Sequence, residues 1–176
     1  KKTAKAEGLD LDNGAVDLIA ILGDGSFRDT HNILQKLLRI GSVTKDGEIT
    51  VVEVEKATGA PKTKLVNDVL QSIVTGDSES GLKTIKQVNE NNVEAKVFMK
   101  LLLEKYRALL LMKISPNEKE LYSDSVSDDD LNFLKELVEK NGEAINSKKM
   151  LDLLEATNQS AKSYLPFLPL EMLLIN

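Results

Sequence analysis

The sequence predicts an all-α protein in which a small helical domain is followed by a larger helical one. Apolar residues recur at three- and four-residue spacing in successive segments, which is the pattern of helices with one buried face. Glycine or proline follows most of these segments, where helices commonly stop. The turn-prone join Gly59-Ala60-Pro61 is the best candidate boundary, so we expect domains over residues 1–60 and 61–176.

Residues 15–39 organise the first domain and predict two amphipathic helices that meet at a Gly-Asp-Gly-Ser corner, residues 23–26. Asp12 or Asn13 can cap the first helix, and Gly23 is expected to end it in the left-handed conformation. The apolar face of this helix consists of Ala15, Leu18, Ile19 and Leu22.

The second helix is expected to begin at the corner and to run to about Arg39, with Gly41 closing it. Ser26 can cap it, and Asp29, three residues later, provides a shorter form of the capping box. Its apolar stripe consists of Phe27, Thr30, Leu34, Leu37 and Leu38.

Arg28 breaks a local rule, because it places a cation in the first turn of the second helix. The partial positive charge of a helix N-terminus favours carboxylates there, so an arginine is mildly destabilising unless an anion joins it. Exposed backbone N–H groups and a guanidinium together suit a phosphate. The alternative is a surface ion pair of Arg28 with Asp24 or Asp29, and such pairs are common and weak.

Residues 48–54 alternate like a strand, but we expect a short extended piece followed by a helix. Thr50 and Glu53 have the spacing of a capping box, and Gly59 stands where the helix would stop. A lone strand would have no partner in this region.

The second domain predicts a succession of helices with clear ends. Their apolar positions fall in residues 65–73, 82–88, 94–113, 131–138, 150–164 and 170–175. The residues expected to start or stop these helices are Gly76, Asn91, Asn92, Gly142, Asn146, Ser147, Pro166 and Pro169. The fifth helix carries Met150, Leu151, Leu154, Ala161 and Tyr164 as its apolar positions.

The helix over residues 94–113 is apolar on nearly all sides toward its C-terminal end. Such a helix is buried on several sides, either in the core of one chain or between subunits. Its surface at residues 101–112 fits both readings equally. Tyr106 and Arg107 interrupt the apolar run and are expected to be a snorkelling pair at the edge of the core.

Residues 114–126 contain Pro116, several charges and two serines, and predict a loop with some mobility. The acidic stretch that follows lacks the spaced carboxylates, central glycine and terminal glutamate of a calcium-binding EF-hand loop. Ser127 with Asp128, Asp129 and Asp130 instead predicts a helix cap and an acidic first turn.

Composition excludes several classes of function for these 176 residues. The net charge of −5 and the scattered lysines and arginines provide no basic stripe, so we expect no direct DNA binding. The chain has no cysteine and one histidine, His31, which is expected to be half-buried; no metal site is expected. No apolar run is long enough for a membrane span, and we expect a cytoplasmic protein without membrane contact.

The run IAILGDGSFRDTHNILQ, residues 19–35, resembles the lid of the AAA+ ATPase in the bacterial DNA polymerase III clamp loader. Gly25, Ser26, Arg28 and Asp29 fall on the Gly-Ser-x-Arg-Asp motif of that family. The resemblance implies that Arg28 is the second sensor, which touches the γ-phosphate of ATP, with Phe27 as a lesser nucleotide contact. No catalytic residue is implied in this chain.

The second half is similar to the collar domain of the clamp-loader γ/τ subunit. The similarity rests on the order of helices, the leucine-rich central helix with Arg107, and the closing run LPFLPLEMLLI, residues 165–175. One position departs from the family, which often has an arginine where Phe167 stands. The resemblance implies an AAA+ lid followed by a collar that holds a ring of subunits together.

By this resemblance, the parent protein would load a sliding clamp on primed DNA, with ATP and Mg²⁺ held mainly by an ATPase domain outside these residues. The chain lacks a Gly-x-x-x-x-Gly-Lys-Ser/Thr loop, so we expect it neither to hydrolyse ATP nor to bind a cofactor tightly alone. It begins with what looks like the end of a helix, as if inside a larger protein. The expected partners are other γ/τ copies, δ and δ′ through the collar, and the clamp and DNA through the whole complex.

Two other readings remain. A branch-migration helicase has a similar lid, but its following DNA-binding domain would need a β-hairpin and basic residues, which the acidic second half lacks. A helical adaptor of a different class would use the apolar surface at residues 101–112 to bind a partner helix, and it would be insensitive to charge removal at Arg28.

Overall fold

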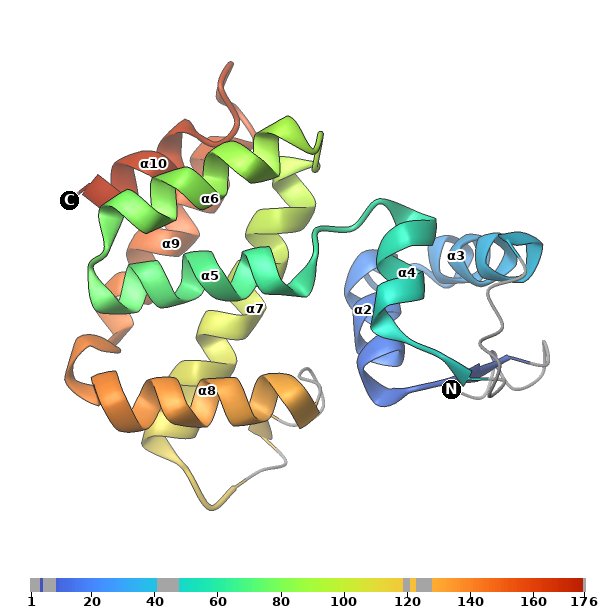
Figure 1. Ribbon diagram of the computed structural model, residues 1–176, viewed down its shortest axis with the longest axis horizontal. Helices are drawn as coiled ribbons and strands as arrows, with labels where there is room; N and C mark the ends of the chain where they lie inside the picture. Colours follow the sequence, from blue (N-terminus) through green and yellow to red (C-terminus); the bar gives the residue numbers. More distant parts are fainter. Residues whose placement is uncertain (1–3, 5–8, 41–47, 119–120, 123–127, 176) are drawn as a thin grey trace. The chain divides into compact units, whose positions relative to one another are not determined.

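The computed structural model describes residue 4 and residues 9–40, 48–118, 121–122 and 128–175. Over these residues the fold is all-α, as the sequence predicts, and strand pairing is limited to two segments of two residues each. The chain divides into two compact units, Lys1–Ala60 and Pro61–Asn176, which run from blue to teal and from teal to red in Figure 1.

The first unit is built from three helices and one short strand pair. Its elements are β1 (Asp10–Leu11), α2 (Asn13–Gly23), α3 (Phe27–Ile40), β2 (Glu48–Ile49) and α4 (Val51–Thr58). The two strands are parallel and pair Asp10 with Glu48 and Leu11 with Ile49. The expectation that an extended piece here has no partner was therefore wrong, because the residues just before α2 supply one.

Side chains fix the starts of α2 and α4. The Asp12 carboxylate accepts a hydrogen bond from the Ala15 N–H at 2.5 Å, so Asp12 is the cap of α2. The Glu53 carboxylate accepts one from the Thr50 N–H at 2.8 Å, which confirms the predicted capping box of α4. Gly59 ends α4 in the left-handed conformation, with φ of 74°.

The core of the first unit comes from the predicted faces of its helices. The buried side chains on helices are Ala15, Leu18 and Ile19 of α2, Leu34 and Leu37 of α3, and Val54 of α4. Leu38 was expected on the same stripe, but it is 40% exposed. It lies one residue beyond Leu37, so the helical rotation of about 100° turns it toward the edge of the core.

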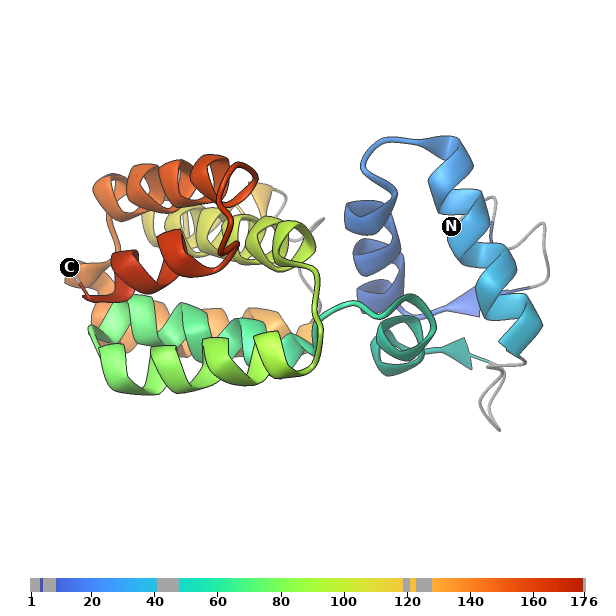
Figure 2. The ribbon, with the colours of Figure 1, turned by 90° about the horizontal axis from the view of Figure 1, so that it is seen from above.

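The second unit contains six α-helices among its described residues. They are α5 (Thr63–Thr75), α6 (Ser78–Glu90), α7 (Ala95–Ile114), α8 (Asp128–Asn141), α9 (Ser147–Ser160) and α10 (Leu168–Ile175), with a 3₁₀ turn, η3 (Gly142–Ala144), before α9. α7 packs against α5, α8 and α9, and α10 packs between α9 and α6, as Figure 2 shows. The helix ends at Gly76, Asn91, Asn146 and Pro169 agree with the predicted ones.

The long helix α7 is apolar nearly all round because three helices cover it within one chain. Leu102 and Leu109 are fully buried, and so is Tyr106. The Tyr106 hydroxyl donates a hydrogen bond to the Asn146 carbonyl at 3.1 Å, and burial raises the pKa of Tyr106. The expected snorkelling of Tyr106 was thus wrong, since its polar end is satisfied inside the core, whereas Arg107 is exposed.

The face of α9 that packs into the core is not the predicted one. Leu153, Ala156 and Ser160 are buried, whereas Leu151 is 64% and Leu154 44% exposed. The larger apolar side chains suggested the opposite face. Small residues at 156 and 160 allow α9 to approach its neighbours closely, and that packing decides which side turns inward.

Close contacts also hold α10. Gly81 of α6 lies under it, and a Cβ atom there would meet the Leu174 methyl carbons at 2.8 and 2.9 Å. Phe167, just before α10, is buried and packs edge-on against Phe98, with ring centroids 5.9 Å apart. The position where the family often has arginine therefore makes an apolar contact in this chain.

A polar cluster joins α8 to the rest of the second unit. The Lys105 ammonium of α7 lies 2.6 Å from the Asp130 carboxylate of α8, and both side chains are 11% exposed. Asn67 of α5 accepts a hydrogen bond from Lys105 at 2.7 Å and donates one to Asp130 at 2.9 Å. Asp130 therefore lies in the first turn of α8 and also links this helix to α5 and α7. The predicted cap, Ser127, lies outside the described residues.

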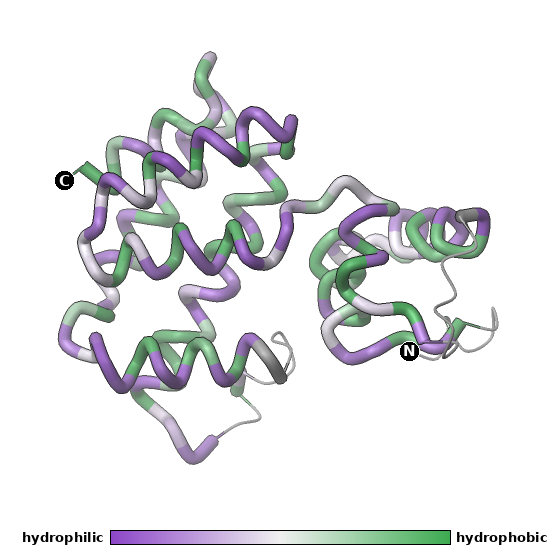
Figure 3. The backbone as a smooth tube through the Cα atoms, in the orientation of Figure 1, coloured by the Kyte–Doolittle hydropathy of each residue, from purple (hydrophilic) through white to green (hydrophobic). Residues whose placement is uncertain are grey.

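Hydropathy along the backbone matches this packing. In Figure 3 apolar and polar segments alternate along α5 and α8, as expected for helices with one buried face.

Part of the predicted loop after α7 also packs, since Tyr122 is buried and its hydroxyl donates to the Pro116 carbonyl at 3.0 Å. The Tyr122 side chain thus joins two parts of this loop.

Candidate functional site

The corner between α2 and α3 is built from two left-handed residues, Asp24 with φ of 50° and Gly25 with φ of 75°. Gly23 was expected to be the left-handed residue, but it is the last residue of α2. Its lack of a side chain serves packing instead, because a Cβ atom would lie 2.2 Å from the Thr30 Oγ1 of α3. The corner therefore holds the two helices at close range.

Ser26 caps α3 as predicted. Its Oγ accepts a hydrogen bond from the Asp29 N–H at 3.2 Å, and its carbonyl accepts one from the Thr30 N–H at 3.0 Å. In a full capping box the Asp29 carboxylate would also accept a hydrogen bond from the Ser26 N–H. That N–H instead donates to the Gly23 carbonyl at 2.7 Å. Aspartate is one methylene shorter than the usual glutamate, so half of the capping box forms.

Arg28 is exposed in the first turn of α3. Among the described residues it forms no ion pair, so the alternative pairing with Asp24 or Asp29 is not made. The N–H groups of Phe27 and Arg28 lie at the positive end of the helix, where backbone donors have no partner within the helix. These groups together are suited to an oxyanion that approaches from solvent.

Phe27 lies beside a small apolar pocket of the first unit, not in its core. Its side chain is 91% exposed, which makes its predicted place in the buried stripe wrong. The pocket has a volume of about 280 Å³, and its lining includes Phe27, Gly25, Ile19 and Leu34. An apolar hollow of this kind can accept the apolar part of a small ligand.

The remaining candidate residue is the single histidine, His31 of α3. His31 is half-buried, as predicted, and its Nε2 lies 3.1 Å from the Gln35 Nε2, one helical turn away. The described part of the chain contains no cluster of three or more potential metal ligands. In the same part, no helix combines the length and the apolar composition needed to cross a membrane.

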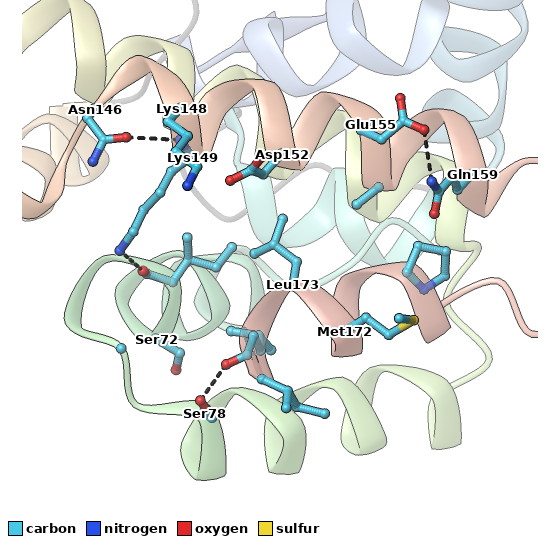
Figure 4. Close-up of a pocket in the computed structure, with 16 residues that line it drawn as sticks. Ser72, Ser78, Asn146, Lys148, Lys149, Asp152, Glu155, Gln159, Met172 and Leu173 are labelled. Carbon is cyan, nitrogen blue, oxygen red and sulfur yellow. Dashed lines mark hydrogen bonds between the residues drawn. The ribbon is translucent and has the colours of Figure 1, made fainter.

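A second concave surface lies within the second unit, between α9, α10 and the turn that joins α5 to α6. This groove has a volume of about 850 Å³ and is shown in Figure 4. The Lys149 ammonium crosses one end and donates to the Ile73 carbonyl at 2.7 Å, which supports the C-terminus of α5. Ser78 donates to the Leu174 carbonyl at the base of the groove. Sequence patterns gave no signal for this groove, because its walls come from distant segments.

Comparison with known families settles which family the chain resembles. The model of "DNA polymerase III subunits gamma and tau domain III" matches residues 49–176, which include α4 and the whole second unit. The chain belongs to this family. The match agrees with the resemblance of the second half to the γ/τ subunit.

Individual relatives are distant and much longer than the chain. The DNA polymerase III subunit gamma/tau of Mycobacterium tuberculosis is 23% identical over 143 residues, which are 81% of this chain and 24% of that protein. The protein STICHEL of Arabidopsis thaliana is 29% identical over 56% of the chain and 8% of its own length. Replication factor C subunit 4 of Encephalitozoon cuniculi is 28% identical over 53% of the chain and 29% of its own length. The chain thus spans less than a third of each relative.

Proposed function

We propose that these residues are the lid and collar of a γ/τ-type clamp-loader subunit, the ATPase that loads a sliding clamp on primed DNA. Membership of the γ/τ domain III family supports a clamp-loader-related role. In this proposal Lys1–Ala60 completes the AAA+ module and Pro61–Asn176 is the collar. The alternatives are a helical adaptor and the lid of a different AAA+ protein, and the family match favours neither.

The nucleotide-sensing part of the proposal rests on one observation, the exposed guanidinium of Arg28 without an ion-pair partner among the described residues. A charged hydrogen bond to the terminal phosphate of ATP would neutralise a cation that the helix end disfavours. Phe27 and the adjacent pocket would add a lesser contact. The groups present fit one end of a nucleotide; the rest of ATP, with Mg²⁺, would be held by the ATPase domain of the parent protein.

The collar part of the proposal concerns assembly. The second unit is a helical body with its own core, in which α7 is covered on three sides by helices of the same chain. This core leaves the outer faces of α9 and α10 open for partners. The partners proposed for the collar are further γ/τ copies, δ and δ′, and the clamp and primed DNA are contacted by the whole complex.

The test of the sensor role is the clamp- and DNA-stimulated ATPase rate of a clamp loader assembled with the full-length parent subunit. Arg28→Ala removes a charged hydrogen bond of about 1.5–3 kcal/mol, so we expect stimulated turnover to fall roughly tenfold or more. Arg39→Ala is the matched control, because Arg39 is an exposed arginine at the other end of the same helix. Equal turnover of the wild type and Arg28→Ala, with assembly intact, would reject the sensor role of Arg28.

A further inference from the structure

In the part of the chain that the structure describes, the long helix α7 has one side that the other helices leave largely uncovered. α5, α8 and α9 pack against its remaining sides. On the uncovered side Arg107 and Ile114 are exposed, Ile114 to 68%, while Leu103 and Leu110 are half-buried. Apolar side chains therefore remain accessible here after the unit has folded, and the core of this unit alone does not account for them.

The positions on this side follow the repeat of a helix that packs lengthwise against another helix. They recur at alternating spacings of four and three residues, and such positions form one straight stripe. The stripe is about 27 Å long, since a helix rises about 1.5 Å per residue. This open face of α7 consists of Lys96, Lys100, Leu103, Arg107, Leu110 and Ile114.

The open face is locally positive, although the chain has a net charge of −5. It carries Lys96, Lys100 and Arg107, and the carboxylate of Glu104 lies at its edge. Among the described residues neither Lys96 nor Arg107 forms an ion pair, so Glu104 does not neutralise Arg107 three residues away. Both cations are exposed and accessible to a carboxylate of another molecule.

Arg107 defines the chemistry of a partner, because it lies in the stripe between Leu103 and Leu110. A helix that covers the two leucines takes the Arg107 guanidinium out of water, which is costly unless a carboxylate pairs with it. Such a partner must combine an apolar stripe with a carboxylate at its centre. Further carboxylates would lie over Lys96 and Lys100.

We propose that the open face of α7 binds an acidic amphipathic helix of a different protein. A second copy of this chain does not fit the charges. In an antiparallel pair of α7 helices, Arg107 would face the partner's Leu103, and Lys100 would face the partner's Leu110. In a parallel pair Arg107 would face the same residue of the partner. Either arrangement would bury cations without carboxylates, whereas an acidic helix supplies them.

This contact is separate from the proposed function. It uses neither the corner at Arg28 nor the outer faces of α9 and α10, on which the sensing and assembly proposals rest. Its failure would leave both of those proposals standing, and their failure would leave this one to be tested by itself.

The first test measures binding of two designed probes to the 176-residue chain by fluorescence anisotropy. The acidic probe is a helical peptide of about three heptads, with leucines in its stripe, a glutamate at the centre of the stripe and glutamates on both flanks. The second probe has lysine in place of the central glutamate alone. We expect the acidic probe to bind with a dissociation constant on the order of 10 µM and the second probe at least about tenfold more weakly.

Variants of the chain show whether the open face is the site. Arg107→Glu should reverse the preference, so that the probe with the central lysine binds more tightly; Arg107 is exposed, so its reversal leaves the core intact. Leu110→Asp should abolish binding of both probes. Lys135→Glu, an exposed charge reversal on α8, is the control and should change neither affinity. Equal affinities of the two probes, an unchanged preference in Arg107→Glu, or binding that survives Leu110→Asp would overturn the proposal.

The second test identifies what covers the open face in the full-length parent subunit. A photo-cross-linking side chain replaces Leu110, or Lys135 as the control, and the cross-linked peptide is sequenced after irradiation in cells. We expect an acidic amphipathic helix of a different protein at position 110, and we expect Arg107→Glu to remove this product. Cross-linking to the same chain, to a second copy or to a segment without acidic residues would overturn the proposal, as would the lack of a specific product at position 110.

Discussion

At the corner of the first unit, two residues break local rules for different reasons. Arg28 places a cation where the helix end favours an anion, and it has no ion-pair partner among the residues that the structure describes. Gly23 puts a weak helix former inside α2, and the reason is visible in its contact with Thr30. A substitution at Gly23, whose small size serves packing, should therefore change the stability of the fold. A substitution at Arg28, which is proposed to meet a ligand, should instead change binding.

The packing role of Gly23 can be measured by a double-mutant cycle with Thr30. Gly23→Ala gains at most about 1 kcal/mol in helix propensity, but it overpacks the corner, which costs about 1–3 kcal/mol. We expect net destabilisation in the wild-type background and a smaller loss, or a gain, when Thr30→Ala is also present. Chemical denaturation of the four chains gives the coupling free energy, and additive effects would show that the close approach carries no strain.

Among the elements, α8 depends most on a polar contact. The Asp130 carboxylate that meets Lys105 and Asn67 is set into a helix whose fully buried apolar side chains include Leu134. Asp130→Ala leaves a largely buried ammonium without this partner, so we expect a loss of about 3 kcal/mol in stability and faster amide exchange in α8 than in α9.

The matched control for α8 removes both charges. Lys105→Met/Asp130→Leu replaces the pair by apolar side chains of similar size, and it should cost less than Asp130→Ala alone. Amide hydrogen exchange of the wild type, Asp130→Ala and Lys105→Met/Asp130→Leu compares the protection of α8 in the three chains. Equal protection of α8 in all three would mean that apolar packing alone holds this helix.

The elements also show what the sequence can and cannot predict. Helix ends were predictable where one side chain or glycine decides them, as at Asp12, Thr50 and Gly76. The inward face of α9 was not, because small residues such as Ala156 pack closely while Leu151 stays outside. The pairing of β1 with β2 and the groove at α10 depend on residues far apart in the chain, and spacing along the sequence carries no such information.

At the scale of the whole molecule, the division into two compact units separates two proposed tasks. The corner of the candidate site lies entirely within Lys1–Ala60, and the surfaces proposed for assembly lie within Pro61–Asn176. The family match begins at residue 49 and covers the second unit completely. Changes at α9 are therefore expected to alter association, and changes at Arg28 to alter the response to nucleotide.

The most direct test of the central claim compares how strongly the full-length parent subunit binds a non-hydrolysable ATP analogue and ADP. A contact between Arg28 and the terminal phosphate predicts that Arg28→Ala weakens binding of the triphosphate by about tenfold to a hundredfold, since a charged hydrogen bond contributes about 1.5–3 kcal/mol. Binding of ADP should be unchanged. Equal loss of affinity for both nucleotides, or no loss for either, would contradict the assignment of Arg28 as the sensor of the γ-phosphate.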